Sequence, residues 1–375
     1  MSGFDPQRTD IATHVSAELD PAERGRAFGR ANRTELHAAF ARYTTLFEAL
    51  GGKTGLIAEW GERALAETAA WAPALAEEIA GMADGAGLDR WRLGALNGRT
   101  EVLAALAVTG EGECSTAVVL PRTGAPRTVQ TWDWHDTFRD GMLLWSLEQG
   151  SGRRVHTFTE FGVVGKIGVT STGLGVHFNV LRHASDHTGI GVPVHVVARR
   201  ILDEADTVRD AVDLARSARL SASSVITVIT FDGERAEAAG LELSPAGVAE
   251  LPLDEDRVLV HTNHFLDPKL AEGEGTTAAV SSTYDRLPGL RDRIGAVDTA
   301  DRTARARALH SHRDGGVPIC AHADHALPAH LRWESLATIS LDLGAGRLYA
   351  HEGGPCRVEQ DGWQAAPPEP QGEIA

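Results

Sequence analysis

With 375 residues, 42% of them hydrophobic, the chain can form one large domain or two smaller ones, and its net charge of −16 argues against nucleic acid and anionic membranes as partners. Three cysteines without CxxC spacing argue against a disulfide framework, and no apolar run reaches the roughly 18 residues of a membrane span. Because the N-terminus also lacks the basic and apolar regions of a signal peptide, we expect a soluble, cytoplasmic protein.

The first part of the chain has a helical pattern. After about 20 polar residues that we expect to be loosely ordered, the periodicity predicts helices over about 21–50, 54–68, 73–84 and 89–106. Gly51 and Gly52 end the first of these helices. The all-α segment stops just before Cys114.

From Cys114 onward the pattern is mostly that of strands. Strands are predicted over 117–120, 128–131, 154–159, 165–170, 175–180, 224–230, 236–243, 258–262, 337–343 and 346–351, and helices over 194–204, 207–218, 283–294 and 301–310. The order α, β, α, β, α, β fits an α+β fold in which two antiparallel sheets stack face to face and helices cover both sides, an αββα sandwich. Residues 364–375 are rich in Pro and Glu, and we expect them to be frayed.

Two of the predicted strands form a β-hairpin that brings a cysteine close to an aspartate. A Gly-rich, acidic turn precedes Cys114, and a turn with Pro121 and Gly124 connects its strand to a returning strand that leads to Asp133. Because the strands are antiparallel, the start of the first lies beside the end of the second. A thiol at that place, beside a carboxylate, suits a chain that cuts itself before Cys114 and uses the new N-terminus for chemistry.

Several blocks of residues, taken in order from about residue 21 to 356, resemble one family. The blocks are Gly85-Ala86-Gly87, Leu96 to Glu101, Glu113-Cys114-Ser115-Thr116, Trp132-Asp133-Trp134, Gly165 to Gly175 followed by Asn179, Gly191 to His195 with Arg199, His261 to His264, Ser281 to Tyr284, and Ser335 to Asp342. Together they resemble the acyl-coenzyme A:6-aminopenicillanate (isopenicillin N) acyltransferase family of N-terminal-nucleophile hydrolases. Their order and spacing, more than any single block, carry the resemblance.

The resemblance implies that the chain cleaves itself at the bond between Glu113 and Cys114. Residues 1–113 would become a helical small subunit and residues 114–375 the αββα subunit that bears the nucleophile, the two forming one composite unit. Their masses would be roughly 12 and 28 kDa if the total is divided by length. Many relatives have Gly before the cysteine, and Glu113 departs from that pattern.

Three residues would carry the chemistry that the resemblance implies. The Cys114 thiolate would attack the Glu113 carbonyl, and the freed α-amino group, with a pKa of about 8 in model peptides, would then serve as the base for the thiol. Asp133 would orient and stabilise the protonated amine, and Asn263 would donate its side-chain amide to the oxyanion. The alternative interpretations are a buried structural cysteine, an aspartate that caps a turn and a turn asparagine.

Four further residues are expected to support the site or bind substrate. Ser115 and Thr116 offer hydroxyls beside the nucleophile, Trp134 follows the motif aspartate, and Ser335 matches a serine near the family's site. The penicillin-making members have an arginine directly after that serine, where this chain has Leu336. The missing cation argues against the same carboxylate-bearing β-lactam substrate.

A metal site is the main competing interpretation. His261 and His264 are spaced HxxH, and Cys320, His322 and His325 are spaced CxHxxH, which is a ligand-rich composition. However, HxxH at the end of a strand points the two rings to opposite faces, and the helical HxxxH of zinc proteases is absent. We therefore expect no metal.

The sequence thus predicts a self-cleaving cysteine amidohydrolase or acyltransferase whose acyl-enzyme is a thioester on Cys114. Hydrolysis of a small N-acylated amine or amino acid, without a cofactor, is the first choice. Acyl transfer from a coenzyme A thioester is the second, because the acidic composition gives no reason to expect its phosphates to bind. Zinc metallohydrolase and a catalytically silent, ligand-binding sandwich are the alternatives from other classes. The sequence does not identify the acyl group, the amine, or any oligomer beyond the two self-generated subunits.

Overall fold

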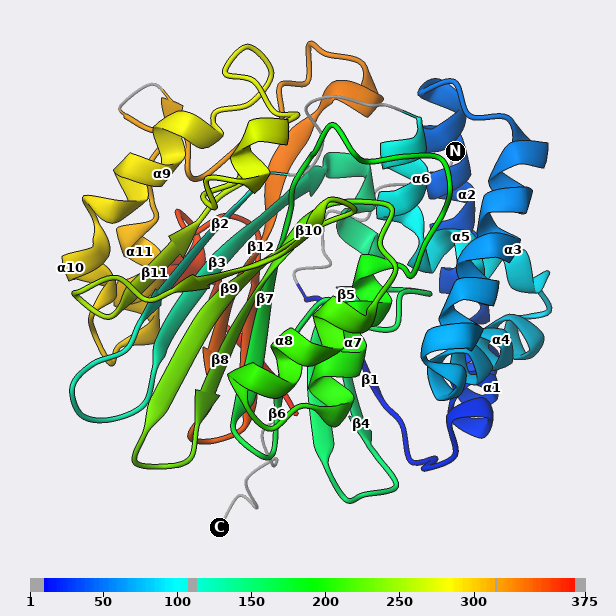
Figure 1. Ribbon diagram of the computed structural model, residues 1–375, viewed down its shortest axis with the longest axis horizontal. Coiled ribbons are helices and arrows are strands. Elements are labelled where there is room, and N and C mark those ends of the chain that lie inside the picture. Colours follow the sequence, from blue (N-terminus) through cyan, green and yellow to red (C-terminus); the bar gives the residue numbers. More distant parts are fainter. Residues whose placement is uncertain (1–9, 107–112, 314–315, 368–375) are drawn as a thin grey trace.

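Two β-sheets stacked face to face form the centre of the molecule, and helices cover their outer faces (Figure 1). The computed structural model describes residues 10–106, 113–313 and 316–367. The predicted α+β class and the αββα layering are confirmed. None of the helices in the described ranges combines the length and the apolar character that a bilayer span needs.

The two sheets differ in size, and all but one of their strand pairs are antiparallel. In the eight-stranded sheet the order is β1 (Ala12–Val15), β4 (Met142–Glu148), β5 (Arg154–Glu160), β6 (Ile167–Thr170), β7 (Leu174–Val180), β8 (Ser224–Phe231), β9 (Ala236–Ser244) and β10 (Gly247–Pro252). In the six-stranded sheet it is β11 (Val258–His261), β2 (Glu113–Val119), β3 (Arg127–His135), β12 (Trp333–Asp342), β13 (Arg347–Glu352) and β14 (Gln364–Ala366). The exception is the parallel pair β1–β4.

Each sheet has its own covering helices. Helices α7 (Val194–Glu204) and α8 (Val208–Ser217) pack on the eight-stranded sheet, and α9 (Thr283–Arg291), α10 (Ile294–Val297) and α11 (Arg302–Ala308) pack on the six-stranded sheet. The short elements are η1 (Asp136–Gly141), η2 (Leu270–Gly273), η4 (Ala329–Leu331) and α12 (Val358–Asp361). A capping box formed by Thr207 and Asp210 fixes the start of helix α8.

The N-terminal helices stand beside the sandwich, on the right of Figure 1. They are α1 (Pro21–Ala31), α2 (Arg33–Ala49), α3 (Thr54–Trp71), α4 (Pro73–Ala86), α5 (Arg90–Asn97) and α6 (Arg99–Ala105). Helices α1 and α4 touch through their backbones, since a Cβ on Gly25 would lie 2.0 Å from the Glu78 carbonyl oxygen. The buried Glu78 carboxylate also binds Arg24 of α1 at 2.6 Å and Arg199 of α7 at 3.1 Å, which fixes the helical segment to the sandwich.

Several predicted element limits were wrong, each for a physical reason. The predicted helix 21–50 breaks at Asn32, the helix 89–106 at Gly98, and the helix 283–294 before Ile294. The side chain of Asn32 donates to the carbonyl of Phe28, so this residue ends α1 instead of continuing it.

Strands were also missed where pairing, and not local pattern, decides the conformation. Residues Ala12–Val15, expected to be loosely ordered, form the edge strand β1, and Gln364–Ala366, expected to be frayed, pair with β13 as β14. The strands β4 and β10 were not predicted either. Residues 1–9 and 368–375 of those two terminal predictions lie outside the described residues.

The side chains of strand β2 point alternately to the two faces of its sheet, and each face has its own hydrophobic core. Cys114 and Val118 belong to the main core between the sheets, whereas Ala117 and Val119 belong to the second core beneath α9, α10 and α11. This alternation follows from the two-residue period of a strand. It places the Cys114 thiol between the two sheets and Ser115 on the side of helix α9.

Candidate active site

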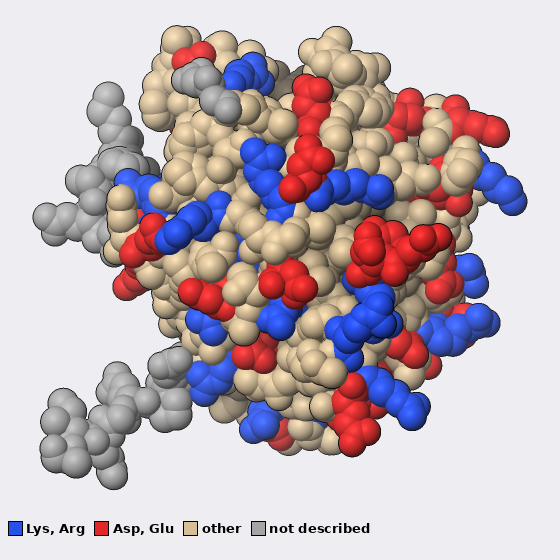
Figure 2. Space-filling model, turned by 90° about the vertical axis from the view of Figure 1, so that its left-hand side faces the viewer, with Lys and Arg blue, Asp and Glu red and all other residues tan. Residues whose placement is uncertain are grey.

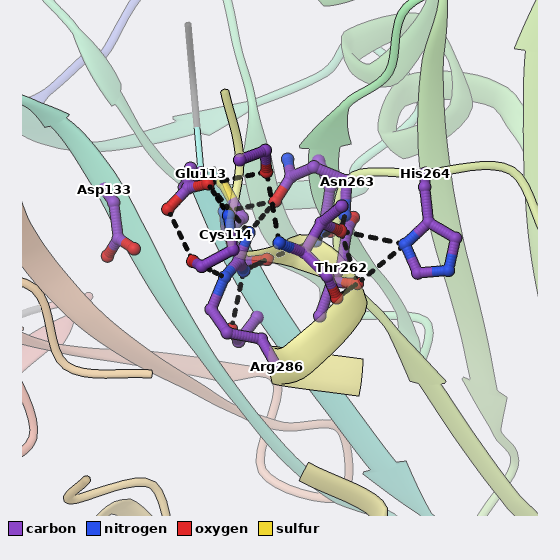
Figure 3. Close-up of polar contacts among 12 residues, drawn as sticks. Glu113, Cys114, Asp133, Thr262, Asn263, His264 and Arg286 are labelled. Carbon is purple, nitrogen blue, oxygen red and sulfur yellow. Dashed lines mark hydrogen bonds and ion pairs between the residues drawn. The ribbon is translucent and has the colours of Figure 1, made fainter. Parts of the chain in front are cut away.

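The predicted hairpin is present and places Cys114 beside Asp133 (Figure 3). In the antiparallel pair β2–β3, Cys114 lies opposite Trp132 and Glu113 lies opposite Asp133. The Cys114 residue is only 2% exposed, and the Asp133 residue is fully buried. The predicted pairing of the two strands is confirmed, and Asp133 is near enough to Cys114 for its charge to raise the pKa of the thiol.

The backbone of Cys114 is held by side chains from three other elements. Its N–H donates to Oδ1 of Asn263 at 2.8 Å. Its carbonyl oxygen accepts from Nη1 of Arg286 at 2.7 Å and from Nδ2 of Asn179 at 3.3 Å. The nucleophile candidate and the two peptide groups around it therefore have little freedom to move.

Burial controls the ionisation of both members of the thiol–carboxyl pair. It raises the pKa of the Cys114 thiol to about 12, and the charge of Asp133 acts in the same direction. Burial also raises the pKa of Asp133 to about 7, against the opposing effects of Arg286 and Ser335. A thiol with this pKa stays protonated at neutral pH, while the carboxyl group can take up or release a proton there.

Asp133 uses only one of its two oxygens within the described structure. Its Oδ1 accepts a 2.6 Å hydrogen bond from Oγ of Ser335 on β12. Its Oδ2 is buried, and no described residue donates a hydrogen bond to it. This unpaired carboxylate oxygen is available to accept a proton or to bind an ammonium group.

Arg286 is a central residue of the site that the sequence did not indicate. It extends from α9, is fully buried, and donates to Oγ of Ser115 at 3.0 Å and to Oδ1 of Asn263 at 3.0 Å, besides the Cys114 carbonyl. Its charge works to lower the pKa of both Cys114 and Asp133. The sequence around it carries no local signal for this role, because its partners lie on other elements.

The carboxylate of Glu113 has a defined binding site of its own. It accepts hydrogen bonds from Oγ of Ser281 at 2.6 Å, and from the N–H and Oγ of Ser282 at 3.0 and 3.1 Å. Arg286 Nη2 lies 3.5 Å from the same carboxylate. Burial favours the neutral form, but Arg286 and the serine donors outweigh it and lower the pKa of Glu113. The residue before the nucleophile is therefore held as an anion.

Asn263 lies where the sequence placed it, directly after β11. Its Nδ2 donates to the Val180 carbonyl at 2.9 Å, and its own N–H donates to Oγ1 of Thr283 at 2.7 Å. One hydrogen of the side-chain amide remains for another acceptor. Asn179, on β7 of the facing sheet, accepts from Oγ1 of Thr116 at 2.8 Å and so connects the two sheets at the site.

The four supporting residues all lie near Cys114 or Asp133. Ser115 and Ser335 contact Arg286 and Asp133 as described, and Thr116 contacts Asn179. Trp134 lines a small cavity, whose other lining residues are Thr100, Leu103, Ala104, Val180, Leu181, Arg182, Asp186 and Ala222. Leu336 is fully buried in the main core.

A buried ion cluster lies close to the nucleophile and was not predicted. The Lys166 ammonium binds the Glu160 carboxylate and lies 3.6 Å from the ring centroid of Trp132. Glu160 also accepts from Arg99 at 2.6 Å. Burial lowers the pKa of Lys166 to about 7, and the lysine charge works to lower the pKa of Cys114. The cluster supplies positive charge near a thiol that must ionise to react.

The two histidines of the HxxH segment have separate partners. Nε2 of His261 lies 2.8 Å from Oε1 of Glu242, and Nδ1 of His264 lies 2.9 Å from Oγ1 of Thr283. Burial, followed by the charge of His261, lowers the pKa of His264 to about 4. In the described ranges neither histidine belongs to a group of side chains that could share a metal ion.

The chain is similar in sequence to known proteins of one family. The family model described as "Acyl-coenzyme A:6-aminopenicillanic acid acyl-transferase" matches residues 122–331, more than half of the chain, a span that includes Asp133, Asn263 and Arg286 and begins after Cys114. The chain is 30% identical over 255 residues to the 40 kDa form of acyl-coenzyme A:6-aminopenicillanic-acid-acyltransferase from Emericella nidulans, covering 68% of this chain and 69% of that protein.

Two solved structures match part of the chain. Penicillin V acylase from Agrobacterium tumefaciens matches with a TM-score of 0.43 and 14% identity, over 64% of this chain and 83% of its own. The Caenorhabditis elegans ortholog of N-acylethanolamine-hydrolyzing acid amidase matches with a TM-score of 0.42 and 14% identity, over 62% and 93%. By the family match and the identity to the Emericella acyltransferase, the chain belongs to the acyl-coenzyme A:6-aminopenicillanic acid acyl-transferase family.

Proposed function

We propose that the chain is a self-cleaving cysteine amidohydrolase that removes the acyl group of a small N-acylated amine or amino acid through a thioester on Cys114. The observation that carries the proposal is the surroundings of Cys114. The N–H of Cys114 donates to Asn263, and its carbonyl oxygen accepts from Arg286. The cross-strand neighbour of Cys114 is Trp132, and the next residue, Asp133, has a carboxylate oxygen without a hydrogen-bond donor in the described structure. These groups match what an N-terminal nucleophile needs before and after cleavage.

Self-cleavage begins without an α-amino group, so another base is required. Cys114 Sγ attacks the Glu113 carbonyl carbon while the thiol proton passes to Asp133, whose pKa of about 7 suits this transfer at neutral pH. The C–N bond then breaks, the Cys114 nitrogen takes up a proton, and Glu113 remains as a thioester on sulfur. Water hydrolyses the thioester and leaves residues 1–113 and 114–375 as two subunits.

Turnover then uses the new α-amino group of Cys114. This amine takes the thiol proton, and as an ammonium group it can bind Oδ1 of Asn263 and the free Oδ2 of Asp133. Sulfur attacks the substrate carbonyl, the remaining hydrogen of Asn263 Nδ2 donates to the oxyanion, and the amine leaves with a proton from the ammonium. Water releases the acid from the thioester. No cofactor enters this hydrolysis.

Buried contacts would keep the two subunits together after cleavage. Glu78 and Arg99 of the helical segment pair with Arg199 and Glu160 of the sandwich, and all four side chains are at most 3% exposed. Each of these two ion pairs joins a side chain of residues 1–113 to a side chain of residues 114–375 in the buried interior. The active form is therefore expected to be one composite unit of two chains.

The binding site of the Glu113 carboxylate also suggests the class of acyl group. In the intact chain Glu113 occupies the acyl position, because its carbonyl carbon is the one that Cys114 attacks. A substrate acyl group joins the same sulfur, so after Glu113 departs its chain can reach Ser281, Ser282 and Arg286. These groups suit a carboxylate separated from the acyl carbonyl by three carbons, as in a glutaryl amide.

Glutaryl amides are expected to be cleaved with a kcat/KM about 10 to 100 times that of pentanoyl amides of the same amine, because a charge-assisted hydrogen bond contributes about 1.5–3 kcal/mol. Measuring the release of amine from both compounds, and from the shorter succinyl amide, tests this preference. Ser282→Ala should reduce the ratio while the pentanoyl amide is still hydrolysed. Faster cleavage of the pentanoyl amide by the wild type would contradict the proposed acyl class but not the nucleophile.

Acyl transfer to an amine uses the same residues and is the alternative fate of the thioester. On the face drawn in Figure 2, basic and acidic side chains are interspersed and form no broad basic area. This distribution gives the phosphates of coenzyme A no particular attraction there. Product analysis with and without a second amine distinguishes transfer from hydrolysis.

A further inference from the structure

Two cysteines and two histidines meet near the start of β12 and the end of β13, and none of them has a role in the proposed catalysis. They are His312, which follows α11, Cys320 and His322 in the loop before β12, and Cys356, which follows β13. One ligand atom from each residue lies within 4.8 Å of all the others. We name these four residues the Cys/His quartet.

The three separations from His322 are close to those of ligands around a tetrahedral ion. Nε2 of His322 lies 3.7 Å from Sγ of Cys320, 3.7 Å from Sγ of Cys356 and 3.1 Å from Nε2 of His312. Zinc bonds of about 2.3 Å to sulfur and about 2.0 Å to nitrogen place tetrahedral ligands roughly 3.3–3.8 Å apart. The three measured separations agree with this range to about 0.2 Å, which is the tolerance expected for a zinc site.

The backbone is shaped so that the quartet can assemble. The N–H of Cys320 donates to the carbonyl of Ser311 at 3.0 Å, which joins the two loops next to two of the ligands. Gly354 precedes Cys356 by two residues, and a Cβ there would lie 2.5 Å from Sγ of Cys320. Gly353 has a φ of +106°, a conformation that other residues rarely adopt. The turn that delivers Cys356 thus requires both glycines.

We propose that the Cys/His quartet binds one zinc ion in a structural site. Two thiolates and two imidazoles are a ligand set that zinc prefers, and two thiolates neutralise its charge. Four protein ligands leave no open position for water or substrate, so the ion has no direct part in the reaction. This site is therefore different from the catalytic zinc of a metallohydrolase.

The zinc site would fix a loop that supports the proposed active site. Ala321, between the ligands Cys320 and His322, donates its N–H to Oγ of Ser335 at 3.0 Å and accepts the Ser335 N–H at 3.0 Å. The Ser335 hydroxyl in turn donates to Asp133. Zinc at the quartet would hold the loop against Ser335 and thereby keep this hydroxyl in place as a positioning residue.

Metal analysis of the purified protein tests the proposal. The wild type is expected to hold about one zinc per chain. The double variant Cys320→Ser/Cys356→Ser and the variant His322→Ala should each hold less than about 0.1 zinc per chain, a loss of at least tenfold. Two variants serve as matched controls and should keep their zinc. His325→Ala alters the same CxHxxH segment, but Nδ1 of His325 lies 3.9 Å from Asp136 and outside the quartet. Cys114→Ala removes the remaining thiol.

A measurement on the wild type alone guards against variants that fail to fold. Cobalt added to chelator-treated, reduced protein should produce the visible bands of a tetrahedral ion and thiolate charge-transfer bands, and zinc should abolish both. Hydrogen exchange of residues 320–335 should be faster without metal than with it. Any of three results would overturn the proposal. The wild type could stay metal-free after incubation with zinc under reducing conditions, Cys320 and Cys356 could prove to form a disulfide, or the double variant could retain its zinc. None of these results would bear on Cys114.

Discussion

Asp133→Asn is expected to lower kcat/KM by about 10²–10⁴ and to slow self-cleavage strongly, because the amide cannot accept the thiol proton or balance an ammonium group. The substitution keeps the shape of the side chain, and its oxygen can still accept from Ser335. In the wild type, the rate of self-cleavage should rise as the pH passes through about 7, where the Asp133 carboxyl loses its proton. That rise should be absent from the variant, as measured by gel densitometry across pH.

Stability separates this role of Asp133 from a purely structural one. Its pKa is raised from 3.8 to about 7 in the folded protein, so the folded state holds the proton more tightly than the unfolded state does. Ionisation therefore lowers the stability of the wild type as the pH rises from about 4 to 7. Asp133→Asn has no such proton, and its Tm should fall less than that of the wild type between pH 5 and 8. An equal fall in both proteins would contradict the buried, titrating carboxyl group.

Arg286→Lys is expected to lower kcat/KM by about 10²–10³ while the protein still folds, because lysine keeps the charge but cannot donate to Cys114, Ser115 and Asn263 at once. Arg286→Met removes the charge as well and should cost about 3–5 kcal/mol of stability, since it leaves the Glu113 carboxylate without its buried cation. The activity of the purified, correctly folded lysine variant and the Tm of both variants are the measurements.

The pH profile provides the control for Arg286. Its charge works to lower the pKa of both Cys114 and Asp133, so its loss in Arg286→Met should move the rise in self-cleavage rate to higher pH. Arg286→Lys should leave the position of that rise nearly unchanged. A lysine variant with wild-type kcat/KM would show that the planar fork of the arginine has no part in the reaction.

Local sequence was enough to predict the central part of the site. A turn between two strands fixes which residues pair, so the pairing of Glu113 with Asp133, one residue from Cys114, follows from the hairpin alone. The family resemblance added Asn263 and Ser335, and both lie in contact with one of that pair. Each of these positions is determined either within one hairpin or at one end of a regular strand.

Residues whose partners are remote in sequence were missed. Arg286 is 172 positions from the Cys114 carbonyl that it binds, and nothing in the helix around it shows that this face is buried against β2. The Cys/His quartet was missed for the same reason. The sequence pattern grouped Cys320 and His322 with His325, whereas the fold brings them together with His312 and Cys356. Strands β1 and β14 were likewise formed by pairing with an available sheet edge.

The most direct test of the central claim is the intact mass of purified wild type beside Cys114→Ala. The account predicts two fragments from the wild type, ending at Glu113 and beginning at Cys114, which elute together in native solution but separate under denaturing conditions. Cys114→Ala should remain one uncut chain under the same conditions. A wild type that stays whole after prolonged incubation at neutral pH would leave Cys114 without a free amino group and would contradict the proposed mechanism.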